Sequence, residues 1–369
     1  MDRRVRGKGG VMKRIRVGII GTGGIAQASH IPSLKKIEGV EIAAIADINE
    51  EKVKYVGEKF GIKGIFTDWE KMLEADIEAV VICSPNALHA EQSIRAMEKG
   101  KDVLCEKPVC LTSEEAEKIF SVADKTGRIF MAAFPRRFSG EAKVLKPMIE
   151  KGEFGEIYYI KASYLRRRGI PGLGTWFTDK KLAGGGPMMD VGVHMLDLVI
   201  YLVGAPEPQI IFGTKYEKFN DKAVDGGWPP METRKGDKTT GKMEVEDLAC
   251  GFVKLSTGAT LFVEASWAGN SETGLKASLF GTKAGVEMPD PQDPRNPVRI
   301  FSENNGILTD IIPQLPHSDM YYEEIVHFID CVRKGKEPIT TKKEIISVVK
   351  IIEGIYKSAE TGNPVICNK

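Results

Sequence analysis

The sequence predicts a two-domain protein, with a doubly wound parallel α/β sheet first and an α+β domain on an open, mainly antiparallel sheet second. The length of 369 residues exceeds what one hydrophobic core usually supports, so two cores are expected. Short β-branched runs alternate with helical patterns up to about residue 133. Longer strands with few helices between them follow, and this change of pattern indicates the second domain.

The first region alternates strands and helices from residue 15 onward. Predicted strands cover residues 15–20, 40–46, 79–83, 103–105 and 129–133, and predicted helices cover 25–37, 50–60, 88–99 and 113–126. This alternation is typical of a parallel sheet with helices on both faces. Ligands of such sheets bind at the carboxyl ends of the strands, so a binding site is expected there.

The predicted domain boundaries are 12–134 and 135–369. Predicted second-domain strands are 156–165, 209–219, 245–255, 259–267 and 275–280, followed by helices at about 319–333 and 342–361. Residues 220–244, rich in Gly, Pro, Asp and Lys, are expected to form a flexible loop or a mobile flap. Residues 1–11 are basic and glycine-rich and are interpreted as a disordered extension.

Composition argues against several classes of partner. The 52 basic and 51 acidic residues nearly cancel, which gives no electrostatic basis for binding nucleic acid or an anionic membrane, and a small or neutral ligand fits better. No apolar run reaches the roughly 18 residues of a membrane span, so a soluble, cytoplasmic protein is expected. The six cysteines form no CxxC pair and the five histidines lie in separate elements, so no metal site is expected.

A glycine-rich turn of the pattern G-x-G-x-x-A follows the first predicted strand and enters a helix. Gly21 permits a tight turn, Gly23 lets the backbone approach a pyrophosphate, and Ala26 allows the helix to pack closely on the strand. The turn alone is a weak signal, but its place between strand and helix predicts dinucleotide binding. The residues expected to hold the pyrophosphate are Gly21, Thr22, Gly23, Gly24 and Ile25.

An acidic residue, Asp47, ends the second predicted strand 26 positions after Gly21. A carboxylate there would accept hydrogen bonds from the adenosine ribose hydroxyls and repel a 2′-phosphate. Ile48 and Asn49 follow it and supply no arginine for such a phosphate. NAD is therefore the expected cofactor, with NADP as the alternative.

A second candidate site lies at residues 184–197, where three glycines and Pro187 lead into an apolar stretch. If residues 188–203 are helical, Asp190 and His194 lie roughly 40° apart around the axis and share one face. An acid and a proton acceptor could then address one small molecule, and the glycines would let the backbone pass close to it. The simpler interpretation is a polar pair on the helix surface.

Three further segments complete the pattern of a known family. Residues 84–89 (SPNALH) follow one predicted strand, residues 105–108 (CEKP) follow the next, and residues 358–362 (SAETG) lie in the last helix. Together with the glycine turn and the Asp-x-x-x-His segment, they make the chain resemble the Gfo/Idh/MocA family from about residue 12 to its end. The family is named after glucose-fructose oxidoreductase, inositol dehydrogenase and the rhizopine-catabolism proteins. The ordered set of motifs is specific, whereas any one of them alone would not be.

The resemblance implies a Rossmann domain and a second domain whose exposed sheet face often forms a dimer or tetramer interface. It also implies NAD(P)-dependent dehydrogenation of sugars, cyclitols or related polyols. It places Lys107 beside the nicotinamide and brings Asp190 and His194 to the substrate. The other residues expected to border the cofactor are Ser84, Pro85, Asn86, His89 and Glu106.

These residue types also suit the oxidation of a secondary alcohol, which needs a base for the hydroxyl proton and a cation beside the oxygen. His194, with an unperturbed pKa of about 6.5, can take the proton. Lys107 can bond the same oxygen, favour the developing alkoxide and relay the proton. Asp190 would fix a neighbouring hydroxyl and support the lysine charge. An isolated Lys-Pro would be a surface turn, but Lys107 follows a parallel strand at its carboxyl end.

Four further side chains are candidates for substrate contact. Arg136 lies at the domain junction, where it could reach a substrate hydroxyl or tie the domains together. Arg166 and Arg168 belong to a run of three arginines, which could serve a phosphorylated or carboxylated substrate or form interdomain salt bridges. Trp267 ends a strand and could stack on a sugar face, although core packing is usual for tryptophan.

The expected function is an NAD-dependent sugar or polyol dehydrogenase. One alternative is a glycosidase or epimerase that oxidises its sugar transiently, retains its NAD and shows no net change in NADH. Another is a non-catalytic regulator that senses a sugar or NAD, and the presence of Lys107 and His194 counts against it. Which sugar and which hydroxyl react depends on second-domain side chains that the sequence does not place in space.

Overall fold

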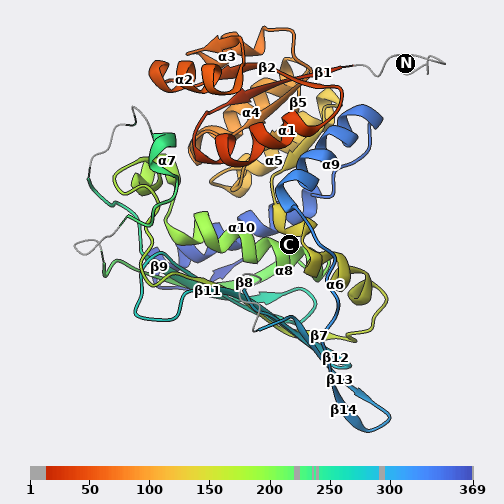
Figure 1. Ribbon diagram of the computed structural model, residues 1–369. Helices are drawn as coiled ribbons and strands as arrows, with labels where there is room; N and C mark the ends of the chain where they lie inside the picture. Colours follow the sequence, from red (N-terminus) through yellow and green to blue (C-terminus); the bar gives the residue numbers. More distant parts are fainter. Residues whose placement is uncertain (1–13, 220–224, 235–236, 238–240, 291–295, 368–369) are drawn as a thin grey trace, which may run out of the picture.

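The computed structural model describes residues 14–219, 225–234, 237, 241–290 and 296–367. The predicted extension at residues 1–11 and part of the predicted loop at 220–244 lie outside the described residues. Two sheets form the framework, and Figure 1 shows helices α8 (Val193–Leu202) and α10 (Lys342–Thr361) lying between the first domain and the long second sheet. The predicted combination of a parallel sheet with a mainly antiparallel one is confirmed.

The first sheet has six parallel strands in the order β3-β2-β1-β4-β5-β6. Its strands are β1 Ile15–Ile20, β2 Val40–Ala46, β3 Gly64–Phe66, β4 Ala79–Ile82, β5 Asp102–Cys105 and β6 Phe130–Ala132. The three-residue strand β3 was not predicted, because it is too short to show a pattern. The order reverses between β1 and β4, which creates a crevice at their carboxyl ends.

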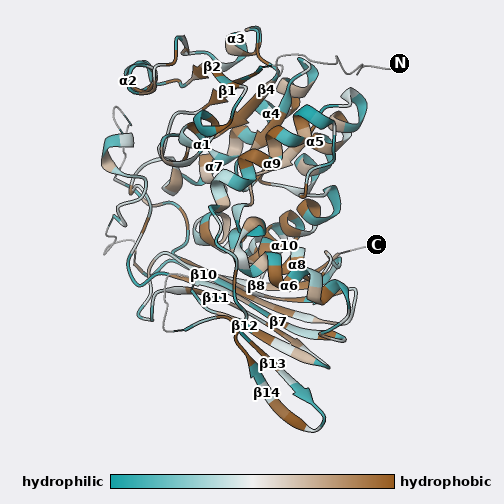
Figure 2. Cartoon of the chain, turned by 45° about the vertical axis from the view of Figure 1, so that its right-hand side comes forward, coloured by the Kyte–Doolittle hydropathy of each residue, from teal (hydrophilic) through white to brown (hydrophobic). Residues whose placement is uncertain are grey.

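Helices cover both faces of this sheet. The helices of the first domain are α1 Ile31–Lys36, α2 Glu50–Phe60, α3 Trp69–Leu73, α4 His89–Glu98 and α5 Ser113–Thr126. A π-helical turn, η1 Ala26–His30, leads into α1. Apolar residues of α3, α4 and α5 belong to one core cluster, and those of α1 and α2 belong to a second cluster on the opposite face. Strand β4 is apolar along its whole length (Figure 2), and every residue of β4 and β5 is buried, as a sheet covered on both faces requires.

The second sheet has nine strands in the order β14-β13-β12-β11-β7-β10-β9-β8-β15, with one parallel pair, β7 and β10. Its strands are β7 Ile157–Leu165, β8 Pro208–Tyr216, β9 Leu248–Leu255, β10 Thr260–Ser266, β11 Gly274–Gly281, β12 Ala284–Met288, β13 Arg299–Asn304, β14 Ile307–Ile311 and β15 Val365–Ile366. The five predicted strands are present, and β12 to β15 were not predicted. The exposed edge hairpin β13–β14 projects from the body of the molecule (Figure 1).

Helices α8 and α10 pack on the inner face of this sheet. The helices of the second half of the chain are α6 Gly140–Glu150, α7 Lys180–Ala183, α8 Val193–Leu202, α9 Met320–Lys334 and α10 Lys342–Thr361. Helix α10 lies so close to the sheet that a Cβ at Gly213 or Gly251 would meet atoms of Ile355 at 2.6 and 2.7 Å. Glycine at these strand positions therefore permits the close helix packing.

The two closing helices pack on different domains. Ile325, Phe328 and Ile329 of α9 belong to the first-domain core cluster that contains α1 and α2, whereas α10 packs on the second sheet. The chain thus returns to its first domain before it ends, which fixes the two domains against each other. None of the described helices is long and apolar enough to cross a membrane.

Candidate active site

The glycine turn at the end of β1 has the shape that a dinucleotide requires. Gly21 has a φ of +86°, and a Cβ there would lie 2.6 Å from the backbone of Cys83, so glycine is needed. A Cβ at Gly23 would meet nothing within 4 Å, so the space in front of this backbone is open to a phosphate. Gly24, in contrast, lies against Pro229 of the second domain. Ile25 begins the helical turn whose amides follow.

The predicted ribose acid is tied to this turn. The Asp47 carboxylate accepts hydrogen bonds from the backbone N–H of Thr22 at 2.9 Å and from its hydroxyl at 3.0 Å. Its other oxygen accepts from the N–H of Asn49 at 3.0 Å. Asp47 is only half-buried, so its carboxylate remains accessible at the end of β2. Turn and acid together fit a dinucleotide with unphosphorylated ribose.

The segment from Ser84 to His89 is bonded to two neighbouring loops, those of Pro108 and Ala183. His89 is buried, and its ring nitrogens lie 2.8 Å from the Ser84 carbonyl and 2.7 Å from the Pro108 carbonyl. The ring therefore links this segment to the loop that carries Lys107. Asn86 is buried and donates a hydrogen bond to the Ala183 carbonyl at 2.9 Å, and Pro85 precedes its short 3₁₀ helix.

Lys107 and Asp190 meet across the domain boundary. Lys107, which follows β5, donates hydrogen bonds to the Asp190 backbone carbonyl at 2.6 Å and to its carboxylate at 3.1 Å. The indole N–H of Trp267 donates to the second carboxylate oxygen at 2.9 Å. Burial would raise the pKa of Asp190, but the charges of Lys107 and Arg166 and the Trp267 hydrogen bond outweigh it and hold the pKa below its usual value. Asp190 is therefore ionised at neutral pH.

The helix that carries Asp190 begins differently from the prediction. Residues Met188–Gly192 form a π-helical turn, η5, in which the N–H of Val193 donates to the Met188 carbonyl, and regular α-helix runs on to Leu202. The uniform helix predicted over 188–203, and the 40° spacing that follows from it, do not apply to this first turn. π turns inside helices are frequent at functional sites.

His194 stands on the following turn and is half-buried. Among the described residues, no hydrogen bond involves its ring. Burial and the nearby charges of Lys107, Arg136 and Arg166 hold its pKa well below the usual value of 6.5. The expectation of an unperturbed pKa is therefore wrong, because burial and the charges of three cations both lower the pKa. The ring is neutral at physiological pH and can accept a proton.

Glu106 is buried and lies against His30. Its carboxylate lies 2.7 Å from His30 Nε2 and also accepts a hydrogen bond from the Lys107 backbone N–H at 3.1 Å. Burial would raise its pKa, yet His30 and Lys107 together bring that pKa below its usual value. The partnership of His30 and Glu106 was not predicted, because 76 positions separate them in the sequence.

The glycine run before the π turn serves protein packing. A Cβ at Gly185 would collide with the Tyr356 hydroxyl, and one at Gly186 would collide with the Glu246 carbonyl. The Glu246 carboxylate accepts hydrogen bonds from the Gly186 N–H at 2.9 Å and the Tyr356 hydroxyl at 2.6 Å. Burial raises the pKa of Glu246 to about 7. Gly185 also lines a polar hollow together with Lys107 and Asp190, so the expectation that these glycines let the backbone pass close to a substrate stays a prediction.

The four predicted substrate contacts have different surroundings. Trp267 is fully buried, so it positions Asp190 from the core and does not offer a free face to a sugar. Arg168 is exposed and bonds the Gly269 carbonyl at 3.1 Å and the Asn270 side chain at 3.0 Å. Arg136 and Arg166 are half-buried, and their charges act on His194.

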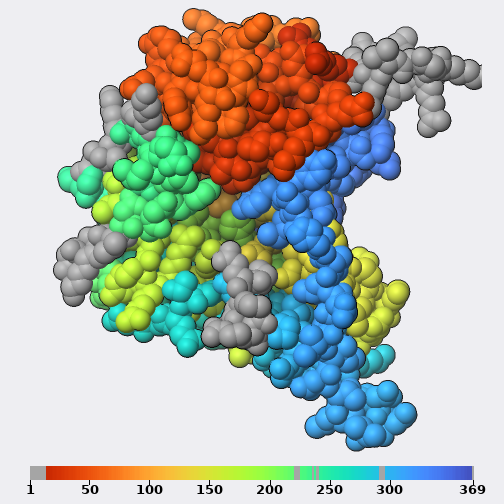
Figure 3. All heavy atoms as spheres, in the orientation of Figure 1, coloured from red at the N-terminus to blue at the C-terminus, as the bar shows by residue number. Residues whose placement is uncertain are grey.

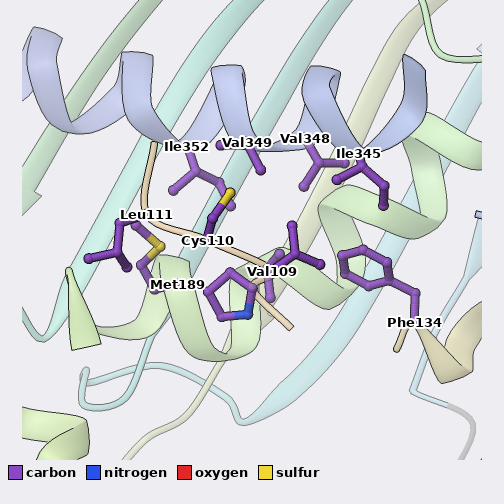
Figure 4. A pocket seen from close by; sticks show the side chains of 11 residues that line it. Val109, Cys110, Leu111, Phe134, Met189, Ile345, Val348, Val349 and Ile352 are labelled. Carbon is purple, nitrogen blue, oxygen red and sulfur yellow. The ribbon is translucent and has the colours of Figure 1, made fainter. Parts of the chain in front are cut away.

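Two hollows flank the Lys107–Pro108 loop. The polar one is lined by Asn86, Lys107, Pro108, Trp176, Phe177, Ala183, Gly185, Asp190 and Trp267. The other is apolar and lies between this loop, the π turn and α10 (Figure 4). It is lined by Pro108, Val109, Cys110, Leu111, Phe134, Met189, Val193, Ile345, Val348, Val349 and Ile352. Of these two hollows among the described residues, the polar one contains the ion pair of Lys107 and Asp190, which makes it the candidate active site.

No group of three potential metal ligands occurs among the residues that the structure describes. The six cysteines are free thiols.

A parallel sheet with an open glycine turn, joined to a lysine, a carboxylate and a histidine, defines an NAD-binding oxidoreductase. Residues 15–134 match the family described as "Oxidoreductase family, NAD-binding Rossmann fold", and residues 146–366 match its "C-terminal alpha/beta domain". The chain belongs to this family, Gfo/Idh/MocA, as its motifs predicted.

Two relatives and one solved structure cover nearly the whole chain. D-glucoside 3-dehydrogenase of Escherichia coli is 30% identical over 355 residues, which are 95% of this chain and 97% of that protein. The NAD⁺-dependent scyllo-inositol 2-dehydrogenase of Bacillus subtilis is 27% identical over 95% of this chain and 96% of its own. Levoglucosan dehydrogenase in complex with NADH and L-sorbose superposes with a TM-score of 0.81 at 22% identity, covering 96% of this chain and 99% of that one, and therefore shares the fold.

Proposed function

We propose that the protein oxidises a secondary alcohol of a sugar, cyclitol or related polyol with NAD(P), and that Lys107 and His194 handle the hydroxyl proton. The observation that carries this proposal is the pairing of Lys107 with Asp190 in the polar hollow, with His194 one turn further along the helix. The match to an NAD-binding domain supports NAD(P) as the cofactor. The relatives named for a glucoside and an inositol support the substrate class.

The geometry suggests a division of roles. Lys107 Nζ uses two of its three N–H groups on Asp190 among the described residues, which leaves one to donate to the substrate oxygen. Its charge then stabilises the developing alkoxide. Neutral His194 accepts the hydroxyl proton, and ionised Asp190 can accept a hydrogen bond from a neighbouring hydroxyl. A bound nicotinamide would supply the hydride acceptor.

The test is to supply purified protein with NAD or NADP and a panel of aldoses, glycosides, inositols and anhydro-sugars, and to follow the absorbance of reduced nicotinamide. We expect kcat/KM to decrease at pH values below the pKa of His194, because the protonated ring cannot accept a proton. His194→Ala should lower kcat by about 10²-fold or more and remove that acidic limb. Wild-type rates in His194→Ala would contradict the assigned role.

A second candidate is an enzyme that retains its NAD and oxidises the sugar only transiently. The observation that favours it is that second-domain residues 225–234 and 237 lie against the first domain (Figure 3). Pro229 lies on Gly24, and Asp237 forms an ion pair with the buried Lys52 of α2. Sugar conversion without net NADH, by protein that purifies with bound nucleotide, would favour this candidate over the first.

We also propose that the outer face of the second sheet pairs with another copy of the chain. Phe212, Phe252 and Phe262 stand opposite one another on neighbouring strands, and the first two are 42% and 51% exposed. An aromatic row of this kind is usual at subunit interfaces. Phe252→Lys should shift the mass measured by light scattering toward the monomer, and a monomeric wild type would contradict the proposal.

A further inference from the structure

We infer that the substrate carries an anionic group, a phosphate or a carboxylate, and that Arg136 and Arg166 bind it beside His194. The inference builds on the proposed dehydrogenase, since it concerns the non-reacting end of the same substrate. It also revises the expectation of a small or neutral ligand, because net charge averages over the whole surface and hides a local excess of cations.

Arg166 is carried to the site by the end of β7. Its backbone N–H donates to the Ser266 carbonyl at 3.0 Å on the neighbouring strand β10. The next residue, Trp267, holds the Asp190 carboxylate through its indole N–H. The Arg166 guanidinium lies over the Tyr164 ring, 5.3 Å from its centroid, and donates to the Gly169 carbonyl at 3.2 Å. It forms no ion pair with any carboxylate of the described chain.

Arg136 reaches the same place from the domain junction. It belongs to the 3₁₀ helix η3, Pro135–Phe138, which follows β6 at the carboxyl edge of the parallel sheet. Its neighbour Arg137 forms an ion pair with Asp197, which lies three residues after His194 on α8. This ion pair holds η3 against α8. Arg136 itself is half-buried, and within the described residues no hydrogen bond or ion pair holds its guanidinium.

The carboxylate whose charge acts on Arg166 already has other partners. Asp190 is held by Lys107 and Trp267. Neither half-buried guanidinium forms an ion pair within the described chain, so Lys107 and the two arginines together leave more positive than negative charge around Asp190 and His194. Removing charge from water without a partner is unfavourable, and an oxyanion of the substrate would relieve this cost. Guanidinium groups match phosphate and carboxylate oxygens in a bidentate manner, whereas a neutral polyol offers only hydroxyl groups.

The test compares sugars that differ only in charge. Protein loaded with NAD is titrated by calorimetry with D-glucose, D-glucose 6-phosphate and D-glucuronate, and with D-fructose and D-fructose 6-phosphate. We expect at least one anionic sugar to bind about tenfold or more tightly than its neutral counterpart. The preference should weaken as salt is raised. The phosphate and carboxylate members show which anion is recognised, and inorganic phosphate alone should compete with the preferred sugar.

Arg136→Gln and Arg166→Gln should each reduce the ratio of anionic to neutral sugar affinity measured on the same variant, and the double variant should bring this ratio close to one. Arg168→Gln is the matched control, because this exposed arginine bonds Gly269 and Asn270 instead, and it should keep the preference. Equal binding of neutral and anionic sugars by the wild type would overturn the inference, even if neutral sugars reduce NAD. Selective binding of anionic sugars without any NAD reduction would instead overturn the proposed dehydrogenase and leave the anion site standing.

Discussion

Two adjacent arginines at the domain junction use their charge in opposite ways. Arg137 is fully buried and is paired on both sides, by Asp197 through two N–H groups at 2.6 and 2.9 Å and by Glu344 at 2.5 Å. Arg136, one position earlier, is half-buried, its charge acts on His194, and it forms no ion pair in the described chain. The junction thus has a structural charge network and, next to it, a set of unpaired cations.

The sequence left two interpretations of Arg136 open, a tie between domains and a contact to substrate. In the structure the neighbouring residue Arg137 makes the structural link, because its ion pairs join η3 to α8 and α10. Arg136 forms no such ion pair in the described chain. A buried, satisfied ion network holds a geometry, whereas an unsatisfied cation next to a cleft favours a ligand. Substitutions in the two regions should therefore change different observables.

The largest effect is expected at the junction. Arg137→Met leaves Asp197 and Glu344 buried without their cation, and it should lower the free energy of unfolding by about 3–5 kcal/mol. Denaturation by urea, followed by circular dichroism, measures this change. Adding Asp197→Asn should recover part of the loss, since one uncompensated charge disappears. The exposed Arg168→Met serves as control and should stay within about 0.5 kcal/mol of wild type. A loss below about 1 kcal/mol in Arg137→Met would show that the network is not structural.

Lys107 tests the cleft side of the comparison. Lys107→Met should lower kcat by about 10²–10³-fold, which corresponds to about 3–4 kcal/mol of transition-state stabilisation. Its free energy of unfolding should fall less than that of Arg137→Met, because Asp190 keeps the Trp267 hydrogen bond and the nearby charge of Arg166. Steady-state NADH formation and urea denaturation on the same preparations measure both quantities. A kcat within threefold of wild type would remove Lys107 from the proposed mechanism.

Two carboxylates at the π turn, Asp190 within it and Glu246 against the glycine run before it, should differ in how they make stability depend on pH. Asp190 is surrounded by cations and is ionised, whereas Glu246 meets the neutral donors Gly186 and Tyr356, and burial raises its pKa from 4.5 to about 7. Between pH 4.5 and about pH 7, Glu246 has lost its proton in the unfolded chain but keeps it in the folded protein. Stability should therefore fall as pH rises through this window, and this contribution should be constant above it.

Glu246→Gln removes this dependence because an amide does not titrate. Relative to wild type, its free energy of unfolding should rise by about 3 kcal/mol between pH 4 and pH 8. Thermal or urea denaturation across this range measures the difference, and the exposed Glu91→Gln provides a matched control without such a trend. Parallel curves for wild type and Glu246→Gln would show that Glu246 ionises normally in the folded protein.

Much of the fold and part of the site could be predicted because their signals are local. The alternation of strands and helices predicts the parallel sheet, and the glycine turn is recognisable because each glycine meets a backbone requirement within a few residues. The order of the turn, Lys107 and the Asp190 segment predicts the family. The roles of these residues in catalysis and cofactor binding stay predictions.

The remaining features depend on residues that are distant in sequence. Glu246 and Tyr356 are 110 positions apart, and Arg137 and Glu344 are 207 apart, so no spacing indicates their contacts. The pKa of His194 could not be anticipated for the same reason, because it depends on cations from three separate segments. The strands β12 to β15 were missed because short strands near or at a sheet edge show little alternation.

The smallest predicted effect concerns the choice between NAD and NADP, which we assign to the charge of the half-buried Asp47. Asp47 is tied to Thr22 and Asn49, so Asp47→Asn should preserve the shape of the turn while removing the charge that repels a 2′-phosphate. We expect the preference for NAD over NADP, measured as the ratio of kcat/KM values with one sugar, to narrow by about tenfold. Asp47→Ala also loses the hydrogen bonds to Thr22, so it should weaken both cofactors in addition. An unchanged ratio in Asp47→Asn would mean that another group, such as the buried Lys52 paired with Asp237, determines the choice.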